Sequence, residues 1–287
     1  MLGFKGSLPM KNKRNIRLVL VYDGGGYHGW QVQPGVLTIQ QVVEDTLSRI
    51  IQERVRVKAA GRTDAGVHAL FQVVNFSTIS SLAPQVLMRA LNALLPPDIR
   101  VIWSEEVPSS FHSRFSAEAK TYQYCIWNSP VACPFLNRYS WWIPMELDLE
   151  AMRRAASQII GEHDFVAFKA SGSDAKNTVR RVIECGWDES GAMLRFSVKA
   201  TGFLRYMVRG LVGTMVEVGL GKRSPEDLIE VIESKERSLA GPTAPARGLF
   251  LARVFYPPEF SLELGGEGCC EWMEHLVGLK VASSSRF

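Results

Sequence analysis

The chain has 287 residues, of which 46% are hydrophobic and 22% are charged, as in soluble globular proteins. Such a length can bury one large core or two cores of ordinary size. The sequence has no run of eighteen apolar residues, and its N-terminus lacks the apolar centre of a signal peptide. These features argue against a membrane protein and predict a cytoplasmic location.

Charge and cysteine usage narrow the expectations further. The formal net charge of +4 is only weak evidence for a nucleic-acid partner, so any basic surface must come from local clustering. The five cysteines form no C-x-x-C pair, and the five histidines form no H-x-x-x-H pair. We therefore expect reduced thiols and no structural metal.

The two ends of the chain differ from its centre. Residues 1–14 carry four basic residues and no acid, and predict a flexible basic arm. Residues 257–279 carry five glutamates and no Lys or Arg. The segment 257–287 is therefore expected to be an acidic, peripheral tail that does not touch nucleic acid.

The N-terminal half, residues 15–110, predicts the order β-α-β-β-α-β. A helix begins after Thr38, which forms a capping box with Gln41, and a second begins at Pro84. A glycine-rich loop, residues 23–31, lacks the spacing of a nucleotide-binding motif. The strands of this half are expected at residues 16–22, 54–58, 70–76 and 99–103.

The C-terminal half, residues 111–256, predicts the same order without repeating the sequence. One helix follows the capping residue Asp148 and ends at Gly161, and an apolar helix covers residues 204–218. Ser224 to Asp227 begin a short additional helix. The strands are expected at residues 121–127, 180–187, 193–198 and 249–255.

This repeated order predicts an α+β protein with two ferredoxin-like halves. Each half would have helices on one face of an antiparallel sheet and leave the other face partly open. A central cleft between the two sheets could hold RNA, because side chains on an open sheet can stack on unpaired bases.

One loop between two predicted strands presents an arginine and a carboxylate. Gly61 and Gly66 enclose Arg62, Thr63 and Asp64. Glycine permits positive φ and close approach of another molecule. Spacing alone favours a polar hairpin turn, because Asp and Gly are common turn residues.

The segment from Gly61 to Ala69 resembles the signature of the TruA-type tRNA pseudouridine synthases. Further blocks resemble the same family in order and spacing, and together they span roughly residues 15–256. Ser113 departs from the family pattern, which usually has Ala there. The further blocks are Tyr22–Gln31, Phe111–Ala117, Lys120–Tyr124, Gly161–Phe165 with Phe168, Gly202–Arg209 and Thr243–Leu249.

The resemblance implies a role for five residues. Asp64 would be catalytic, Arg209 would pair with it, and Tyr122 would stack on the target base. Arg62 would fill the gap left by a flipped uridine, and Leu249 would line the base pocket. Each also has a structural interpretation: a turn aspartate, a surface arginine, an ordinary strand aromatic, a phosphate contact and a core leucine.

The implied reaction breaks the N1–C1′ bond of uridine and forms a C5–C1′ bond. Because this is an isomerisation, it requires no redox cofactor, ATP or metal. Asp64 could attack the base, attack the sugar or remove a sugar proton, and the sequence does not choose among these routes.

The resemblance also implies a substrate and an assembly. The substrate would be the anticodon arm of tRNA, modified at positions 38, 39 and 40, and the enzyme would be a homodimer. Two alternative functions are a non-catalytic RNA-binding or RNA-chaperone protein and a glycosidic hydrolase, which usually needs a second carboxylate. Seven basic residues are candidate phosphate contacts: Arg114, Lys120, Lys169, Lys176, Arg180, Arg181 and Arg205.

Overall fold

The computed structural model describes residues 13–170, 172 and 175–262. The N-terminal half contains β1 (Arg14–Tyr22), α1 (Ile39–Ile51), β2 (Lys58–Ala59), β3 (His68–Thr78), α2 (Pro84–Leu94) and β4 (Ile99–Val107). The C-terminal half contains β5 (Ala119–Asn128), β6 (Trp141–Ile143), α3 (Leu149–Ser157), β7 (Gly161–Asp164), β8 (Val179–Ser190), β9 (Met193–Ala200), α4 (Met207–Gly219), α5 (Asp227–Ser234) and β10 (Leu249–Phe255). Short 3-10 turns occur at η1 (Gly24–Gly26), η2 (Phe165–Phe168), η3 (Arg237–Leu239), η4 (Ala246–Gly248) and η5 (Pro258–Phe260).

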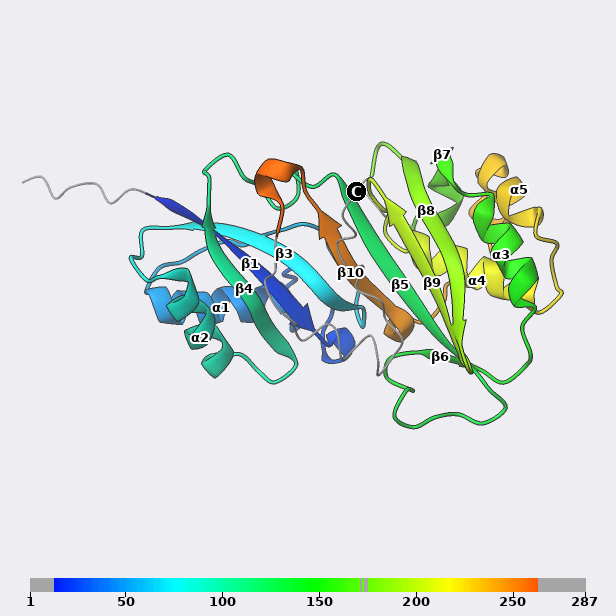
Figure 1. The fold of residues 1–287 in the computed structure, drawn as a ribbon, viewed down its shortest axis with the longest axis horizontal. Coiled ribbons are helices and arrows are strands. Elements are labelled where there is room, and N and C mark those ends of the chain that lie inside the picture. Colours follow the sequence, from blue (N-terminus) through cyan, green and yellow to red (C-terminus); the bar gives the residue numbers. More distant parts are fainter. Residues whose placement is uncertain (1–12, 171, 173–174, 263–287) are drawn as a thin grey trace, which may run out of the picture.

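All ten strands belong to one sheet, in the order β4-β1-β3-β10-β5-β9-β8-β7, with β2 on β3 and β6 on β5. The prediction of two separate antiparallel sheets is therefore wrong. A short parallel pairing, Phe250 with His68 and Leu251 with Ala69, joins β10 to β3. Figure 1 shows β10 between the strands of the two halves. The chain is thus a mixed α+β structure in which the two halves share a continuous sheet.

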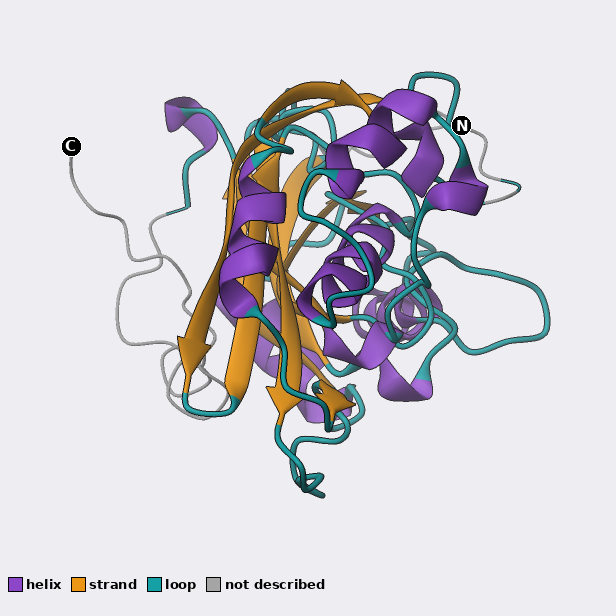
Figure 2. Ribbon diagram, turned by 90° about the vertical axis from the view of Figure 1, so that its right-hand side faces the viewer, coloured by secondary structure: helices purple, strands orange, loops and turns teal. Residues whose placement is uncertain are grey.

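The helices gather beside this sheet, α1 and α2 along the N-terminal half and α3, α4 and α5 along the C-terminal half (Figure 1). Figure 2 shows the strands as one curved layer with most helices to one side. Fully buried side chains from both halves, such as Leu18, Leu47, Tyr124 and Leu211, belong to one continuous core. Within the described residues, no helix is long and apolar enough to cross a membrane.

Two predicted helix starts are confirmed by their caps. The Thr38 hydroxyl accepts the amide of Gln41 at 3.4 Å, and the Asp148 carboxylate accepts the amide of Ala151 at 2.8 Å. Each cap satisfies an amide that has no partner inside the helix. α3 ends at Ser157 rather than at Gly161, which has a positive φ of 113° and begins β7.

The strand predicted at residues 54–58 is mostly absent, because β2 covers only Lys58–Ala59. The alternating pattern has another cause. Val55 and Val57 are buried in the core, and the amide of Val57 donates to the Glu44 carboxylate of α1 at 3.0 Å. The alternating pattern of this segment therefore reflects packing against α1 rather than pairing with a neighbouring strand.

The described ends of the chain are packed rather than free. Arg14 opens β1 and donates to the Glu106 carboxylate at 2.8 Å, so the sheet begins one residue earlier than the predicted arm 1–14 allows. The Phe260 ring lies 5.3 Å from the Phe111 ring, and the Phe260 carbonyl accepts from Arg17. The first part of the predicted tail thus contacts the N-terminal half. Residues 1–12 and 263–287 lie outside the described residues.

Candidate functional site

The Asp64 loop, residues 60–67, connects β2 to β3 and folds as a tight turn. The amide of Val67 donates to the Asp64 carbonyl at 3.1 Å, and Gly66 has a φ of 76°. A positive φ at the third position of such a turn is the reason for glycine there. The turn interpretation is therefore correct, and it leaves the Asp64 side chain available for contacts with the other half.

The glycine-rich loop, residues 23–31, packs against the Asp64 loop. The amide of Trp30 donates to the Thr63 carbonyl at 3.0 Å, and the hydroxyls of Tyr22 and Thr63 lie 2.8 Å apart. Gly29 has a φ of 86°, and a Cβ added to it would lie 2.7 Å from the Thr63 carbonyl oxygen. Burial raises the pKa of Tyr22 to about 12, so its hydroxyl remains neutral in this contact. The glycine-rich loop, which lacks the spacing of a nucleotide-binding motif, thus supports the loop that carries Asp64.

Asp64 faces two arginines from the C-terminal half. Its Oδ2 lies 3.8 Å from a terminal nitrogen of Arg209, and its Oδ1 lies 3.8 Å from Nε of Arg205. The Asp64 side chain is only 19% exposed. Burial raises the pKa of this carboxyl above its ordinary value, while Arg209, Arg205 and the backbone amide of Tyr206 oppose that rise.

Arg209 is held in place by the last motif of the chain. Its Nε donates to the Ala244 carbonyl at 2.7 Å, and the Ala244 amide donates to the Arg209 carbonyl at 3.0 Å. The Arg209 side chain is 14% exposed. Buried arginines are rare without partners, and this one has both a carbonyl and the Asp64 carboxylate. The predicted contact between Asp64 and Arg209 is therefore present.

Tyr206, which the sequence did not single out, lies between the two arginines. It precedes α4 in the left-handed conformation, with a φ of 68°. The guanidinium carbons of Arg205 and Arg209 lie 5.0 and 4.9 Å from the centre of its ring. These distances are those of cation–π contacts. In the sequence, only the position of Tyr206 between Arg205 and Arg209 could have indicated that it contacts both arginines.

Tyr122 lies beside the start of the Asp64 loop. It is 7% exposed, and its ring makes an edge contact with Phe203 at 4.9 Å. A Cβ added to Gly61 would lie 3.7 Å from the Tyr122 hydroxyl. Burial, followed by the neighbouring Tyr22 and Asp64, raises the pKa of Tyr122. Tyr122 is therefore a neutral aromatic beside the loop.

Leu249 and Arg62, the two other residues expected to act at the target base of the RNA, differ in exposure. Leu249 is 5% exposed, begins β10 and pairs with Tyr124 of β5. Arg62 is exposed on the Asp64 loop. Both positions are compatible with the roles that the resemblance implies, and equally with core packing for Leu249 and a phosphate contact for Arg62.

Three of the seven predicted basic residues, Lys120, Arg114 and Arg180, lie close together, with Lys120 beside Gly61. Lys120 is 9% exposed, and its side chain would lie 3.6 Å from a Cβ on Gly61. Burial, together with the charges of Arg114 and Arg180, lowers the pKa of Lys120 to about 8. No carboxylate pairs with Lys120 among the described residues. A buried amine beside two guanidinium groups lacks its counter-ion.

The other four basic residues are more dispersed. Arg205 reaches Asp64. Lys169 is close to Arg205 in the backbone, because the amide of the next residue, Ala170, donates to the Arg205 carbonyl at 3.0 Å. Lys176 is exposed in the segment before β8, and Arg181 is exposed on β8 itself. In the described part of the chain, no contact joins Lys176 or Arg181 to the Asp64 loop.

A second polar network, also missed by the sequence analysis, fixes the end of the Asp64 loop. Nδ1 of His68 lies 3.0 Å from the Asp23 carboxylate, and Nε2 lies 3.1 Å from the Arg247 carbonyl. Asp23 also accepts from Arg138 at 2.8 Å and from the Tyr139 hydroxyl at 3.0 Å. Although burial opposes it, hydrogen bonding to His68 and to the amide of Gly25 holds the pKa of Asp23 well below its usual range.

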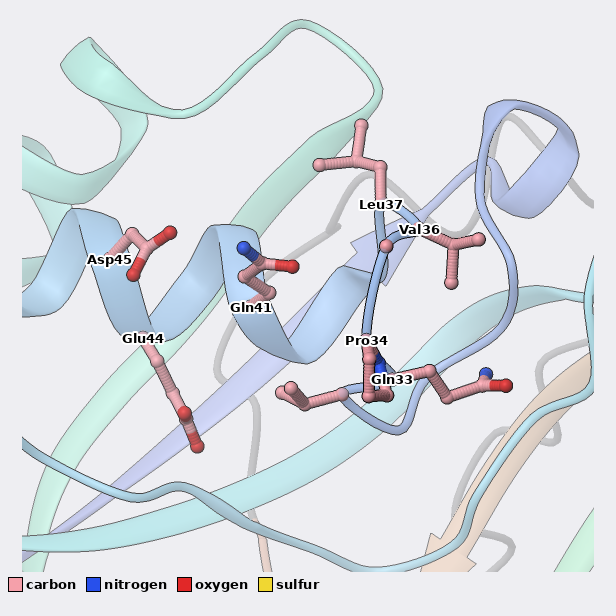
Figure 3. A pocket seen from close by; sticks show the side chains of 9 residues that line it. Gln33, Pro34, Val36, Leu37, Gln41, Glu44 and Asp45 are labelled. Atoms are coloured by element: carbon pink, nitrogen blue, oxygen red, sulfur yellow. The ribbon is translucent and has the colours of Figure 1, made fainter.

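The surface has two hollows of interest. One lies between the segment 32–37 and α1, and Figure 3 shows Gln41, Glu44 and Asp45 along it. None of the predicted site residues lines this hollow. The Glu44 carboxylate already accepts hydrogen bonds from Gln40, Arg56 and the amide of Val57. The other is lined in part by Arg205 and Tyr206, the neighbours of Asp64. Within the described residues, no three His, Cys, Asp or Glu side chains are grouped as metal ligands.

Comparison with known proteins identifies the family. A family model described as tRNA pseudouridine synthase matches residues 19–116 and 155–257. The tRNA pseudouridine synthase A of Thermoanaerobacter sp. (strain X514) is 43% identical over 243 residues, which cover 85% of this chain and 100% of the relative. The relative of the same name from Methylacidiphilum infernorum is 46% identical, with coverage of 85% and 96%. That from Burkholderia mallei is 41% identical, with coverage of 90% and 95%. The chain belongs to the tRNA pseudouridine synthase family.

Proposed function

We propose that this chain isomerises uridine to pseudouridine in tRNA and that Asp64 carries the chemistry. The observation that supports the role of Asp64 is its placement: a largely buried carboxylate between Arg209 and Arg205, beside Tyr122. Attack on the base, attack on the sugar and removal of a sugar proton all require the ionised carboxylate. The two guanidinium groups favour that form against the effect of burial.

The remaining site residues take complementary roles. Tyr122, neutral and buried beside the loop, stacks on the target base, and Leu249 lines the base pocket. Arg62 is exposed on the same loop, as a residue must be if it is to occupy the gap left by a base that has flipped out of the helical stack. Arg114, Lys120 and Arg180 contact phosphates, for which their unneutralised positive charge is suited. Lys169, Lys176, Arg181 and Arg205 extend this contact.

The substrate region is the anticodon arm, with uridines at positions 38, 39 and 40 as targets. Family membership and the relatives' names support tRNA as the substrate class. Incubating unmodified tRNA transcripts with the enzyme and mapping pseudouridine by sequencing tests this directly. Pseudouridine at these positions supports the proposal, and release of free uracil would instead indicate a hydrolase. Tight binding without either product would indicate a non-catalytic RNA-binding protein.

The architecture is best explained as two ferredoxin-like halves, residues 15–110 and 111–256. Within the sheet, β4-β1-β3-β2 and β10-β5-β9-β8 follow the same order relative to the chain. This equivalence supports the proposal, and the sharing of one sheet places the Asp64 loop of the first half against α4 of the second. A homodimer stays a prediction from the resemblance, and a cytoplasmic location stays a prediction from the sequence composition; light scattering after size-exclusion chromatography tests the first.

A further inference from the structure

A turn at residues 111–116, the Phe115 turn, exposes a large aromatic ring between β4 and β5. The Phe115 side chain is 77% exposed. The Arg114 guanidinium carbon lies 5.6 Å from the centre of the Phe115 ring. Large exposed aromatic side chains beside cations are a feature of surfaces that bind unpaired bases.

Hydrogen bonds order the backbone of the turn that carries the ring. Nδ1 of His112 accepts the amides of Arg114 and Phe115 at 3.1 and 3.3 Å, and the His112 carbonyl accepts the amide of Ser116 at 2.9 Å. The rings of His112 and Phe115 lie 4.4 Å apart. Burial, helped by the charges of Lys58 and Arg114, lowers the pKa of His112, so Nδ1 stays available as an acceptor. Because the turn is already ordered, binding to it costs little conformational entropy.

The turn is also fixed to the strand that leads into the Asp64 loop. The fully buried Ser113 donates its hydroxyl to the Lys58 carbonyl of β2 and its amide to Asn75 of β3 at 2.9 Å. The Tyr256 hydroxyl donates to the Ser113 carbonyl at 2.7 Å. Alanine at position 113 could not make the hydroxyl contact. Asp64 is the sixth residue after Lys58, so the two are at most about 22 Å apart along the chain.

Positive charge continues from the Phe115 turn toward the Asp64 loop. Lys58 and Arg114 act on His112, while Arg114 and Arg180 act on Lys120, which packs against Gly61. A strand of RNA that followed these cations would pass the Phe115 ring before reaching Asp64. The arrangement combines a stacking surface with phosphate contacts on one path.

We propose that Phe115 is a stacking site for an unpaired base of the substrate RNA, separate from the pocket of the target uridine. Arg114 contacts a phosphate next to that base. This inference rests on the proposed function, and it adds a second point at which the enzyme recognises a non-helical region of its substrate. An unpaired base fits because it offers a flat face to the ring and a phosphate to the guanidinium group.

The test compares steady-state kinetics of pseudouridine formation for wild type, Phe115→Ala, Phe115→Leu and Phe115→Tyr on an anticodon stem-loop RNA. Loss of one stacked base weakens binding by about tenfold. We expect KM to rise by about this factor for Phe115→Ala and for Phe115→Leu, which keeps an apolar side chain but no ring. Phe115→Tyr keeps the ring and should keep the wild-type KM. The matched control is Phe135→Ala, because Phe135 is 86% exposed in the segment between β5 and β6 and should leave KM unchanged.

A fluorescent base analogue separates stacking from other effects. 2-Aminopurine, placed in turn at each unpaired position of the stem-loop, should be quenched by wild type at one non-target position, and not by Phe115→Ala. An unchanged KM and no Phe115-dependent quenching would overturn the inference, and so would an equal KM for the leucine and wild-type proteins. Loss of self-association with unchanged KM would assign the ring to a protein interface instead. If wild type makes no pseudouridine, the proposed function itself fails.

Discussion

The carboxylate of Asp64 and the guanidinium group of Arg209 lie 3.8 Å apart, although they belong to different halves of the chain. Asp64 is on a loop between β2 and β3, and Arg209 is in α4. The backbone of Ala244 hydrogen-bonds to both the side chain and the backbone carbonyl of Arg209. The shared sheet brings the two together. The site therefore depends on the joint between the halves as much as on either half alone.

Replacing Arg209 should change how activity depends on pH. Burial raises the pKa of Asp64 and Arg209 lowers it, so Arg209→Met should raise it further. If the ionised carboxylate reacts, activity falls as the pH drops through this pKa, and the acid limb must move to higher pH in the variant. Single-turnover rates across pH measure this shift. Arg209→Lys keeps the charge and should move the limb less; a profile identical to that of wild type in Arg209→Met would contradict the ion pair.

Gly29→Ala should damage the Asp64 loop. Gly29 and Gly35 both have positive φ, 86° and 76°, but only at Gly29 would a Cβ meet the Thr63 carbonyl. Either substitution places alanine in a strained conformation that costs about 1 kcal/mol. Gly29→Ala should lower the melting temperature more than Gly35→Ala and reduce the turnover number at least tenfold. Equal effects of the two substitutions would mean that the contact with Thr63 is unimportant.

Lys120 should make tRNA binding depend on pH. Burial lowers its pKa to about 8, so the free enzyme loses this charge as the pH rises through 8. A bound phosphate favours the charged amine and raises its pKa, which means that binding takes up a proton above pH 8 and weakens as the pH rises. Dissociation constants between pH 7 and 9 test this. Lys120→Arg stays charged and should remove the dependence; a dependence that persists in this variant would exclude Lys120 as its source.

Phosphate contact should also appear as a steep dependence of affinity on salt. For a single-stranded contact, the logarithm of affinity falls with the logarithm of salt by about 0.7 per phosphate neutralised. Arg180→Gln should reduce that slope by about this amount, whereas Glu189→Gln, on the far end of β8, should not. Filter-binding titrations between 50 and 300 mM salt distinguish the two variants. A flat salt response in wild type would remove phosphate contact from the account.

Local signals in the sequence located most elements. Thr38 and Asp148 began helices as predicted, because a side-chain cap acts on amides only three residues away. The apolar helix began at Met207 rather than at Leu204, because Tyr206 takes a left-handed conformation and the helix can start only after it. The single sheet was not predictable, since it depends on two residue pairs between β3 and β10, which lie far apart in the sequence.

The same distinction applies to the site. Asp64 and Arg209 were identified through the family resemblance, and their contact is present in the structure. The roles of Tyr206, Asp23 and His68 depend on contacts between segments that no spacing pattern connects. Arg54–Lys58 shows the opposite error, in which a clear alternation reflected packing against α1 rather than a strand. Patterns therefore predicted local structure, while the neighbours of the site came from the folded chain.

Tritium release from tRNA labelled at C5 of uridine tests the central claim most directly, with wild type and Asp64→Ala measured side by side. Pseudouridine formation must replace the hydrogen at C5, so the account predicts release by wild type and none by Asp64→Ala. The tRNA affinity of the variant should stay within a few-fold of wild type, because Asp64 makes no phosphate contact. Release by Asp64→Ala at the wild-type rate would show that the reaction proceeds without this carboxylate and would contradict the account.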